Sequence, residues 1–235
     1  MPKLRFKDRE DAGQQLGAEL RSYAKERPVI VSLPSGGVPV GFEVARSLGA
    51  PLDAWVVKKI GVPWHPQMGV GAIAEGGQLS ISRSFIDEIG LTGLELAQAT
   101  ETARKEVGDS VRWLRGDRPR ISVRGRMVML IDDGIDTGGT VLAAVEAIRS
   151  ETPKLIVLAV PVATPSVLSV IGPKVDRVVC LHTPNALHSL GLWYDDFTHV
   201  PDEEVSRFLE RARKFSASGD LAFSHGLPLR PQLVR

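Results

Sequence analysis

The most informative part of this sequence is the stretch Val128-Met129-Leu130-Ile131-Asp132-Asp133-Gly134-Ile135-Asp136-Thr137-Gly138-Gly139-Thr140. Four apolar residues lead into two adjacent carboxylates. A loop with two glycines and two threonines follows, and then apolar residues with the spacing of a helix. A continuous apolar run is typical of a strand that is covered on both faces, as in a parallel sheet. Because ligands of such sheets bind outside the carboxyl ends of the strands, we expect a ligand site at the end of this run.

The two halves of this stretch suit different chemical groups. The backbone N–H groups of residues 136–140 and the N-terminus of the following helix favour an anion of the size of a phosphate. Asp132 and Asp133 can only accept hydrogen bonds when ionised, so they suit vicinal sugar hydroxyls, which donate. Alternatively, the carboxylates are a helix cap and the glycines a plain turn. No single structural requirement explains all of the parts together, so we expect a sugar and a phosphate held side by side.

The stretch resembles the PRPP-binding motif of type I phosphoribosyltransferases, where PRPP is phosphoribosyl pyrophosphate. The resemblance implies that Asp132 and Asp133 bind the ribose hydroxyls and that residues 136–140 bind the ribose phosphate. The match is closest to the 6-oxopurine branch, in which an aspartate at the place of Asp136 handles the proton of the purine ring. Asp136, Asp132 and Asp133 are therefore the catalytic candidates. Gly134 and Gly139 depart from the family pattern, which usually has a branched apolar residue at the first and, in the oxopurine branch, often a lysine at the second.

A second candidate loop is Leu33-Pro34-Ser35-Gly36-Gly37-Val38-Pro39, between a predicted strand and a predicted helix. In the family this loop binds pyrophosphate and often contains a cis peptide bond. Over most of its length the chain resembles a bacterial branch that has arginine at the place of Ser35. A serine removes a charge that would pair with pyrophosphate, so we expect Ser35, Gly36 and Gly37 to hold that group loosely. Alternatively, the loop is an ordinary turn between a strand and a helix.

Lys58 and Lys59 end the next predicted strand. In orotate-type relatives a basic pair at this place reaches the pyrophosphate, although the pair is also compatible with a solvated strand end. Residues 61–77, or the shorter segment Ala74-Glu75-Gly76-Gly77, would then form a lid. Such a lid would keep water away from an oxocarbenium-like reaction centre.

The acceptor base is expected to bind under a hood formed by residues 183–200. This segment resembles the oxopurine hood, in which an aromatic residue stacks on the base and an aspartate follows a few residues later. His188 stands at the stacking place, Asp195 stands at the acidic place, and Trp193 is an alternative stacking residue. Alternatively, the aromatic residues of this segment only cover an edge of the core.

The order of apolar segments predicts an α/β fold with an open parallel sheet, helices on both faces and a small hood. We expect one domain over residues 1–215 and an irregular tail over residues 216–235. The expected elements are helices at 6–25, 38–48, 92–116 and 202–214, and strands at 28–33, 52–57, 68–74, 78–82, 128–131, 155–160 and 175–181.

Composition excludes several classes of function. The 235 residues carry a net charge of +1, which gives no electrostatic reason to expect nucleic-acid binding. No apolar stretch approaches the length that spans a membrane, and no signal-peptide hydrophobic region follows the basic N-terminus. We therefore expect a cytoplasmic protein without nucleic-acid or membrane partners, and a homodimer stays open.

The resemblance implies a Mg²⁺-dependent phosphoribosyltransferase with PRPP and a nitrogenous base as its partners. It would displace pyrophosphate from PRPP with a ring nitrogen of a purine-like base. Mg²⁺ would be bound through the substrate oxygens and not directly by the protein. The alternative is a non-catalytic regulatory protein of the same fold that binds PRPP or nucleotides.

Overall fold

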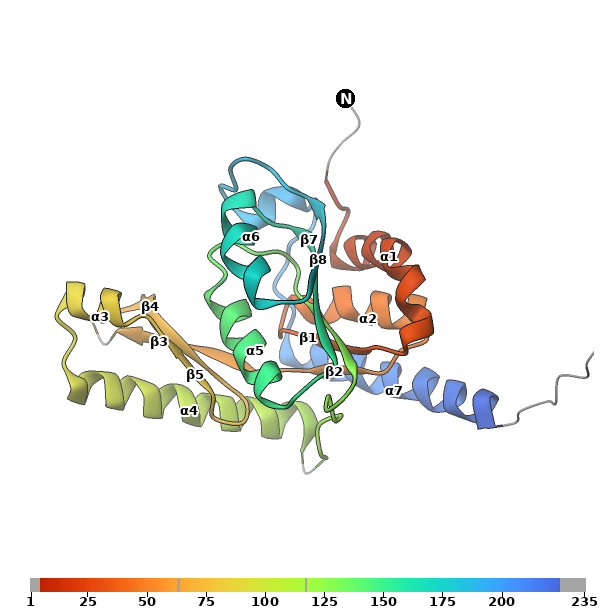
Figure 1. Cartoon of the computed structure of the whole chain (residues 1–235), viewed down its shortest axis with the longest axis horizontal. Coiled ribbons are helices and arrows are strands. Elements are labelled where there is room, and N and C mark those ends of the chain that lie inside the picture. The colour runs from red at the N-terminus through yellow and green to blue at the C-terminus, as the bar shows by residue number, and fades with distance from the viewer. Residues whose placement is uncertain (1–4, 63, 117, 225–235) are drawn as a thin grey trace, which may run out of the picture.

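The computed structural model describes residues 5–62, 64–116 and 118–224. Its main sheet is parallel throughout and has the strand order β2-β1-β6-β7-β8, which confirms the expected open α/β sheet (Figure 1). The order reverses between β1 and β6, and a reversal of this kind is where open α/β sheets bind their ligands. The strands are β1 (Val29–Ser32), β2 (Leu52–Ala54), β6 (Met127–Ile131), β7 (Leu155–Val162) and β8 (Arg177–His182).

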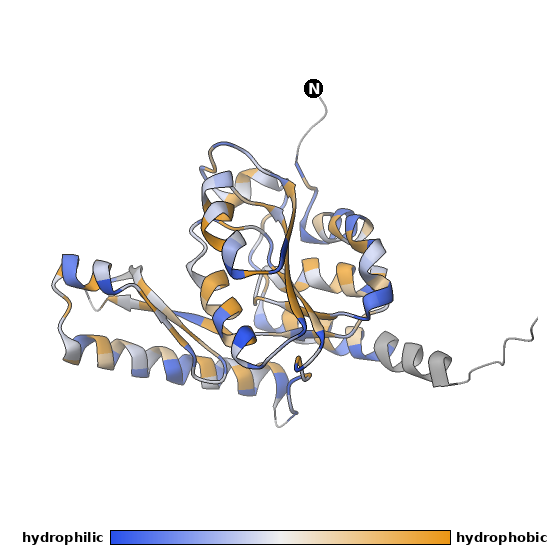
Figure 2. Ribbon diagram, viewed as in Figure 1, coloured by the Kyte–Doolittle hydropathy of each residue, from blue (hydrophilic) through white to orange (hydrophobic). Residues whose placement is uncertain are grey.

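Helices cover both faces of this sheet because successive strand residues point to opposite sides. Met129 and Ile131 pack in the core beneath the first group of helices, whereas Val128 and Leu130 pack beneath the second group. Figure 2 shows the resulting concentration of hydrophobic residues on the strands of the main sheet. The first group is α1 (Arg9–Glu19), α2 (Gly37–Leu48) and α7 (Asp202–Ser224), and the second is α5 (Gly139–Ser150) and α6 (Pro165–Ile171).

A second, antiparallel sheet of three strands forms an arm together with α3 and α4, at the left of Figure 1. The arm also corrects one prediction. Lys58 and Lys59 do not end a strand of the main sheet, because β2 ends at Ala54 and both lysines lie within β3. Trp55 and Val56, both buried, make the transition between the two sheets. The elements of the arm are β3 (Val57–Val62), β4 (His65–Ala74), β5 (Leu79–Ile81), α3 (Arg83–Ile89) and α4 (Gly93–Arg115).

The first helix begins later than the sequence indicated. Asp8 caps α1, because its Oδ1 accepts the backbone N–H of Asp11 at 2.8 Å, so the helix starts at Arg9 and not at residue 6. The last part of the predicted helix is the 3₁₀-helix η1 (Leu20–Glu26). Phe6 instead forms a parallel bridge with Tyr194. Residues 6 and 7 therefore pair with the hood.

Two segments that are far apart in the sequence pair in the hood. The N–H of Phe6 donates to the Trp193 carbonyl at 2.9 Å, and the N–H of Asp195 donates to the Phe6 carbonyl at 2.8 Å. The rings of Phe6 and Tyr194 lie 5.4 Å apart between centroids and are buried. The chain also forms two 3₁₀-helices, η2 (Gly172–Lys174) after α6 and η3 (Leu190–Trp193) within the hood.

The C-terminal helix is longer than expected. α7 continues to Ser224 instead of ending near Lys214, so residues 216–224 are helical and not irregular. The rest of the predicted tail lies outside the described residues. Among the helices of the described residues, none is both long enough and apolar enough to span a membrane.

Candidate active site

The two candidate loops lie against each other at the carboxyl ends of β1 and β6. The N–H of Leu33 donates to the Ile131 carbonyl at 3.0 Å, just before each loop begins. A Cβ on Gly36 would lie 2.0 Å from Oδ2 of Asp133, so only a glycine lets the first loop approach this carboxylate. The peptide bond between Pro34 and Ser35 is cis, as the family resemblance implied. The predicted pyrophosphate loop and the predicted ribose carboxylates therefore share one site.

Asp133 is held by two residues from outside both motifs. Nε of Arg9 donates to Oδ2 of Asp133 at 2.7 Å, and each of the two side chains is only 11% exposed. The Tyr194 hydroxyl donates to the backbone carbonyl of Asp133. Burial, together with the charge of Asp133, raises the pKa of Tyr194, so the phenol stays protonated and remains a donor.

Asp132 has an unusual electrostatic environment. Its Oδ1 accepts the N–H of Asp133 at 2.9 Å. Burial is the main reason that the pKa of Asp132 lies well above its ordinary value, and the negative charge of Asp133 raises it further. Adjacent carboxylates with such unequal surroundings are characteristic of functional sites.

The loop after the carboxylates is open to a ligand. Ile135 anchors it, because the Ile135 N–H donates to the Val162 carbonyl at 2.9 Å, whereas Asp136, Thr137 and Gly139 are exposed. Gly138, at a φ of 81°, is the N-cap of α5 and provides no capping side chain. The first N–H groups of α5 are thus without a capping side chain, which favours binding of an anion.

The other loop offers fewer donors. The N–H of Gly37 donates to the Leu33 carbonyl at 3.1 Å, and the N–H of Val38 donates to the Ser35 carbonyl at 3.2 Å. These two amides at the start of α2 are already used within the chain. Ser35 and Gly36 are half-buried, and the loop carries no charged side chain of its own.

The two predicted lysines differ in their surroundings. Lys59 lines a cavity of about 410 Å³ together with residues of the ribose-phosphate loop. Lys58 lies beside it in β3 and therefore points to the opposite face of the small sheet. The cavity is lined by Lys59, Gly69, Val70, Gly71, Ala72, Ser80, Ile81, Ser82, Thr137, Gly139, Thr140 and Leu142.

The segment 74–77 is fastened to the core. The N–H of Glu75 donates to the Val56 carbonyl at 2.7 Å. Its carboxylate pairs with Arg115, which is 1% exposed, and with Arg120 at 3.6 Å. Arg115 also lies 3.8 Å from the buried carboxylate of Asp53. These contacts argue against residues 74–77 as the closing lid.

The predicted base-binding residues lie in different environments within the hood. Trp193 is half-buried, and its ring stacks on His182 with 5.6 Å between the centroids. Burial lowers the pKa of His182, which favours the neutral form of this ring. His188 and Asp195 are exposed. Sequence analysis gave His182 no role, and its place at the end of β8 was the one available signal.

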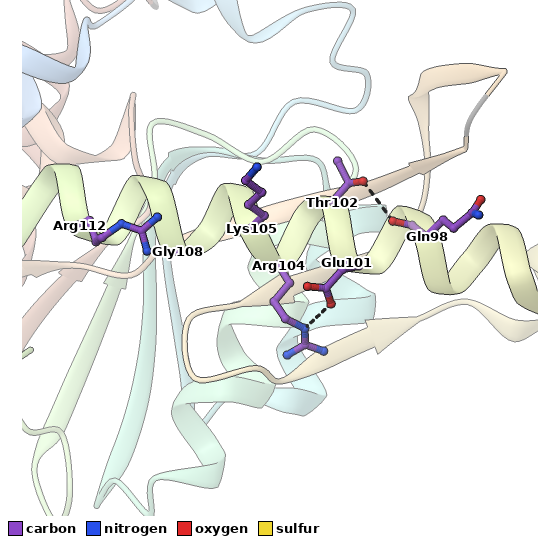
Figure 3. A pocket seen from close by; sticks show the side chains of 7 residues that line it. All are labelled: Gln98, Glu101, Thr102, Arg104, Lys105, Gly108 and Arg112. Atoms are coloured by element: carbon purple, nitrogen blue, oxygen red, sulfur yellow. Dashed lines mark hydrogen bonds and ion pairs between the residues drawn. The ribbon is translucent and has the colours of Figure 1, made fainter.

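A hollow of about 550 Å³ on the outer face of α4 contains none of the predicted site residues. Figure 3 shows that its lining side chains extend from one helix and that two of its contacts, Arg104 with Glu101 and Thr102 with Gln98, stay within that helix. Over residues 5–62, 64–116 and 118–224, no group of three or more histidine, cysteine or acidic side chains is arranged to hold a metal ion.

Comparison with known proteins identifies the family. The model of the phosphoribosyl transferase domain matches residues 7–188, which include both loops and both carboxylates. The chain belongs to the phosphoribosyltransferase family. Two curated Mycobacterium tuberculosis proteins, from strains CDC 1551 and H37Rv, are provisionally named phosphoribosyl transferases. Each is 39% identical to this phosphoribosyltransferase chain over 236 residues, covering 98% of this chain and 52% of the relative.

The chain thus spans about half the length of these curated relatives. A crystal structure of TT1426 from Thermus thermophilus is similar over nearly its whole length. It has 35% sequence identity and a TM-score of 0.73, and the match covers 88% of this phosphoribosyltransferase chain and 98% of the other. The fold described above is therefore shared with a solved structure.

Proposed function

We propose that this protein transfers the phosphoribosyl group of PRPP to a ring nitrogen of a purine-like base and releases pyrophosphate. The observation that carries the proposal is the contact between the two loops at the reversal of the strand order. A carboxylate pair, an uncapped helix N-terminus and a second glycine loop meet there. One molecule that carries a ribose, a phosphate and a pyrophosphate matches these three parts.

The carboxylates would act on the ribose. Asp132 and Asp133 accept hydrogen bonds from its vicinal hydroxyls. Their negative field also favours the positive charge that develops on the ribose ring when pyrophosphate leaves. Residues 136–140 hold the ribose phosphate, and Lys59 is the lysine that lines the cavity beside them. Ser35, Gly36 and Gly37 face the leaving group, and Lys58 is a weaker candidate there because it points away from the cavity.

The residues present fit Mg²⁺ that is carried by the substrate. Asp133 is already paired with Arg9, and within the described residues the two carboxylates are not part of any group of three or more side chains arranged to hold a metal ion. Mg²⁺ on the pyrophosphate oxygens would neutralise the charge of the leaving group. The chain's own task is then to fix the ribose and exclude water.

The acceptor base would lie beneath the hood. Trp193 is the strongest candidate for stacking, because its backbone is fixed by Phe6. His188 and Asp195 are exposed and could reach a base only from the rim. Asp136 is exposed in the loop and is the candidate for proton transfer with the acceptor nitrogen.

Calorimetry with PRPP and Mg²⁺ tests the carboxylate assignment. We expect the wild type to bind and Asp132→Asn combined with Asp133→Asn to weaken binding about tenfold or more, because two acceptors of sugar hydroxyls are changed. Unchanged affinity in the double variant would contradict the assignment of Asp132 and Asp133 to the ribose.

Turnover with a panel of bases then separates an enzyme from the alternative, a regulatory protein that only binds. The lack of charge in the Ser35 loop is what favours that second candidate.

The role of Asp136 has a separate kinetic signature. Asp136→Asn should lower kcat about 10²-fold, the lower end of the contribution of general acid–base catalysis, and leave PRPP affinity almost unchanged. Steady-state kinetics and calorimetry on the same preparation measure both quantities. If kcat and PRPP affinity fall together, Asp136 is a binding residue instead.

A further inference from the structure

Arg9 connects three separate parts of the molecule. It is the first residue of α1, and its Nε donates to Asp133 at the end of β6. Its Nη1 donates to the Thr198 carbonyl in the hood at 2.8 Å. Its guanidinium also lies over the Phe197 ring, 3.9 Å from the centroid. Arg9 lies outside the two loops at residues 33–39 and 128–140.

The guanidinium is also close to the pyrophosphate loop. A Cβ on Gly36 would lie 3.0 Å from Nε of Arg9 and 2.0 Å from Oδ2 of Asp133. The loop, the carboxylate and the guanidinium are therefore packed tightly against one another at Gly36. A shift of Arg9 would remove the one charged partner that holds the Asp133 carboxylate against Gly36 among the contacts described above.

We infer that Arg9 is a positioning residue for the ribose subsite: it holds Oδ2 of Asp133 and thereby presents the other carboxylate oxygen to a vicinal hydroxyl of the sugar. This inference rests on the proposed function. A carboxylate has about four lone-pair sites, so one bond to Arg9 leaves acceptors for the ribose. The same guanidinium ties residues 197–198 of the hood to the carboxylate that holds the sugar.

The geometry of an arginine is needed for this arrangement. Its planar group can donate to Asp133 and to Thr198 in fixed directions while its face stacks on Phe197. A lysine would keep the charge, but it has neither the planar face nor donors in a fixed fork. Because both partners are largely buried, solvent screens their ion pair less than a surface pair.

Several other titratable groups surround Arg9 and Asp133. Asp132 and Tyr194 face Asp133, and Asp8, Glu10, Asp196, His199 and Glu204 line a cavity of about 320 Å³ beside Arg9. Arg9 lowers the pKa of Asp132, opposing the effects of burial and of Asp133. Loss of Arg9 should therefore raise the pKa of Asp132. Sugar binding needs ionised carboxylates. As the pH is lowered, binding by the variant should therefore begin to weaken at a higher pH than binding by the wild type.

The experiment compares ribose 5-phosphate with inorganic phosphate as ligands of the full chain. Arg9→Met should weaken ribose 5-phosphate about tenfold, the worth of one hydrogen bond between charged and polar groups, and leave inorganic phosphate unchanged. Arg9→Lys should recover part of the loss. Arg112→Met is the matched control, because Arg112 forms an exposed ion pair with Asp109 on α4 and should change neither ligand.

A double-mutant cycle separates positioning from a general structural role. If Arg9 acts through Asp133, Arg9→Met should have no further effect on ribose 5-phosphate in the Asp133→Asn background. Equal weakening of both ligands, a full effect in that background, or no effect in the wild type would each overturn the inference.

A carboxyl titration by ¹³C NMR keeps this result distinct from the proposed function. If the wild type does not bind ribose 5-phosphate, the proposed function fails. The link between Arg9 and the carboxylates is then decided by the pKa of Asp132, which should rise in Arg9→Met and stay nearer the wild-type value in Arg9→Lys. An unchanged pKa of Asp132 in both variants would overturn the inference as well.

Discussion

The ionised form of Asp132 serves sugar binding in the proposed function but lowers the stability of the fold. Its folded-state pKa lies above the ordinary value because of burial and of the neighbouring Asp133. Between the unfolded and folded pKa values the folded chain binds more protons, so the free energy of unfolding contributed by this group falls as the pH rises. Its stabilising share is present at low pH and is lost as the pH rises through the folded pKa.

Asp132→Asn should therefore stabilise the protein at about pH 8 by about 0.5–2 kcal/mol, the usual gain from a single stabilising substitution. Urea unfolding at about pH 8 and about pH 5 measures the effect, which should shrink at the lower pH. Asp109→Asn, which changes an exposed carboxylate on α4, serves as the control. A variant that is less stable at both pH values would show that Asp132 supports the fold.

At the level of elements, the loop between β1 and α2 depends on Gly36. A methyl group on this residue would lie 2.0 Å from Oδ2 of Asp133, so Gly36→Ala must displace either the carboxylate or the loop. We expect kcat/KM to fall about 10²-fold, as when a reacting group is misplaced by about 1 Å.

Gly93→Ala is the matched control for this loop variant. A Cβ on Gly93 meets no atom within 4 Å, so its kcat/KM should stay within about twofold of wild type. Near-normal turnover by Gly36→Ala would mean that the loop moves freely away from Asp133. The loop would then not fix the carboxylate.

The sequence was sufficient for those elements whose signals are local. The apolar run, the paired aspartates and the glycines lie within thirteen consecutive residues, and they predicted the strand, the loop and the helix. Arg9 was missed because a basic residue after a helix-capping aspartate is also typical of a solvated helix start. Its partner Asp133 lies 124 positions away, and no local pattern indicates such a contact.

The arm shows a second reason for a missed prediction. Residues 52–62 are apolar apart from Gly61 and three charged residues, Asp53, Lys58 and Lys59, and periodicity does not reveal that the chain leaves one sheet and enters another. The bend at Trp55 is fixed by tertiary contacts, including the Arg120 guanidinium 3.8 Å from the centre of its ring. The sequence could therefore predict two basic residues on a strand but not the face that each occupies.

At the scale of the whole molecule, the hood depends on Phe6. This side chain is 1% exposed and packs against Tyr194 and His182. Phe6→Ala should lower the free energy of unfolding by about 3–5 kcal/mol, the usual cost of removing a buried phenylalanine ring. Urea unfolding measures it, with Leu94→Ala, an exposed residue on α4, expected within about 0.5 kcal/mol of wild type. A loss as small as that control would show that the hood is held by other contacts.

The pairing of Phe6 with residues 193–195 has a consequence for the order of folding. Phe6 precedes every strand of the main sheet in the sequence, whereas its partners at residues 193–195 follow the last of those strands. The hydrogen bond from Arg9 to the Thr198 carbonyl likewise joins residues far apart in the sequence. The nascent chain can form β1 and β6 early, but contacts of such long sequence separation close slowly. A chain that has formed its sheet but not yet this contact would therefore carry an unfinished sugar site, which makes closure of the hood a late step between a folding chain and a working one.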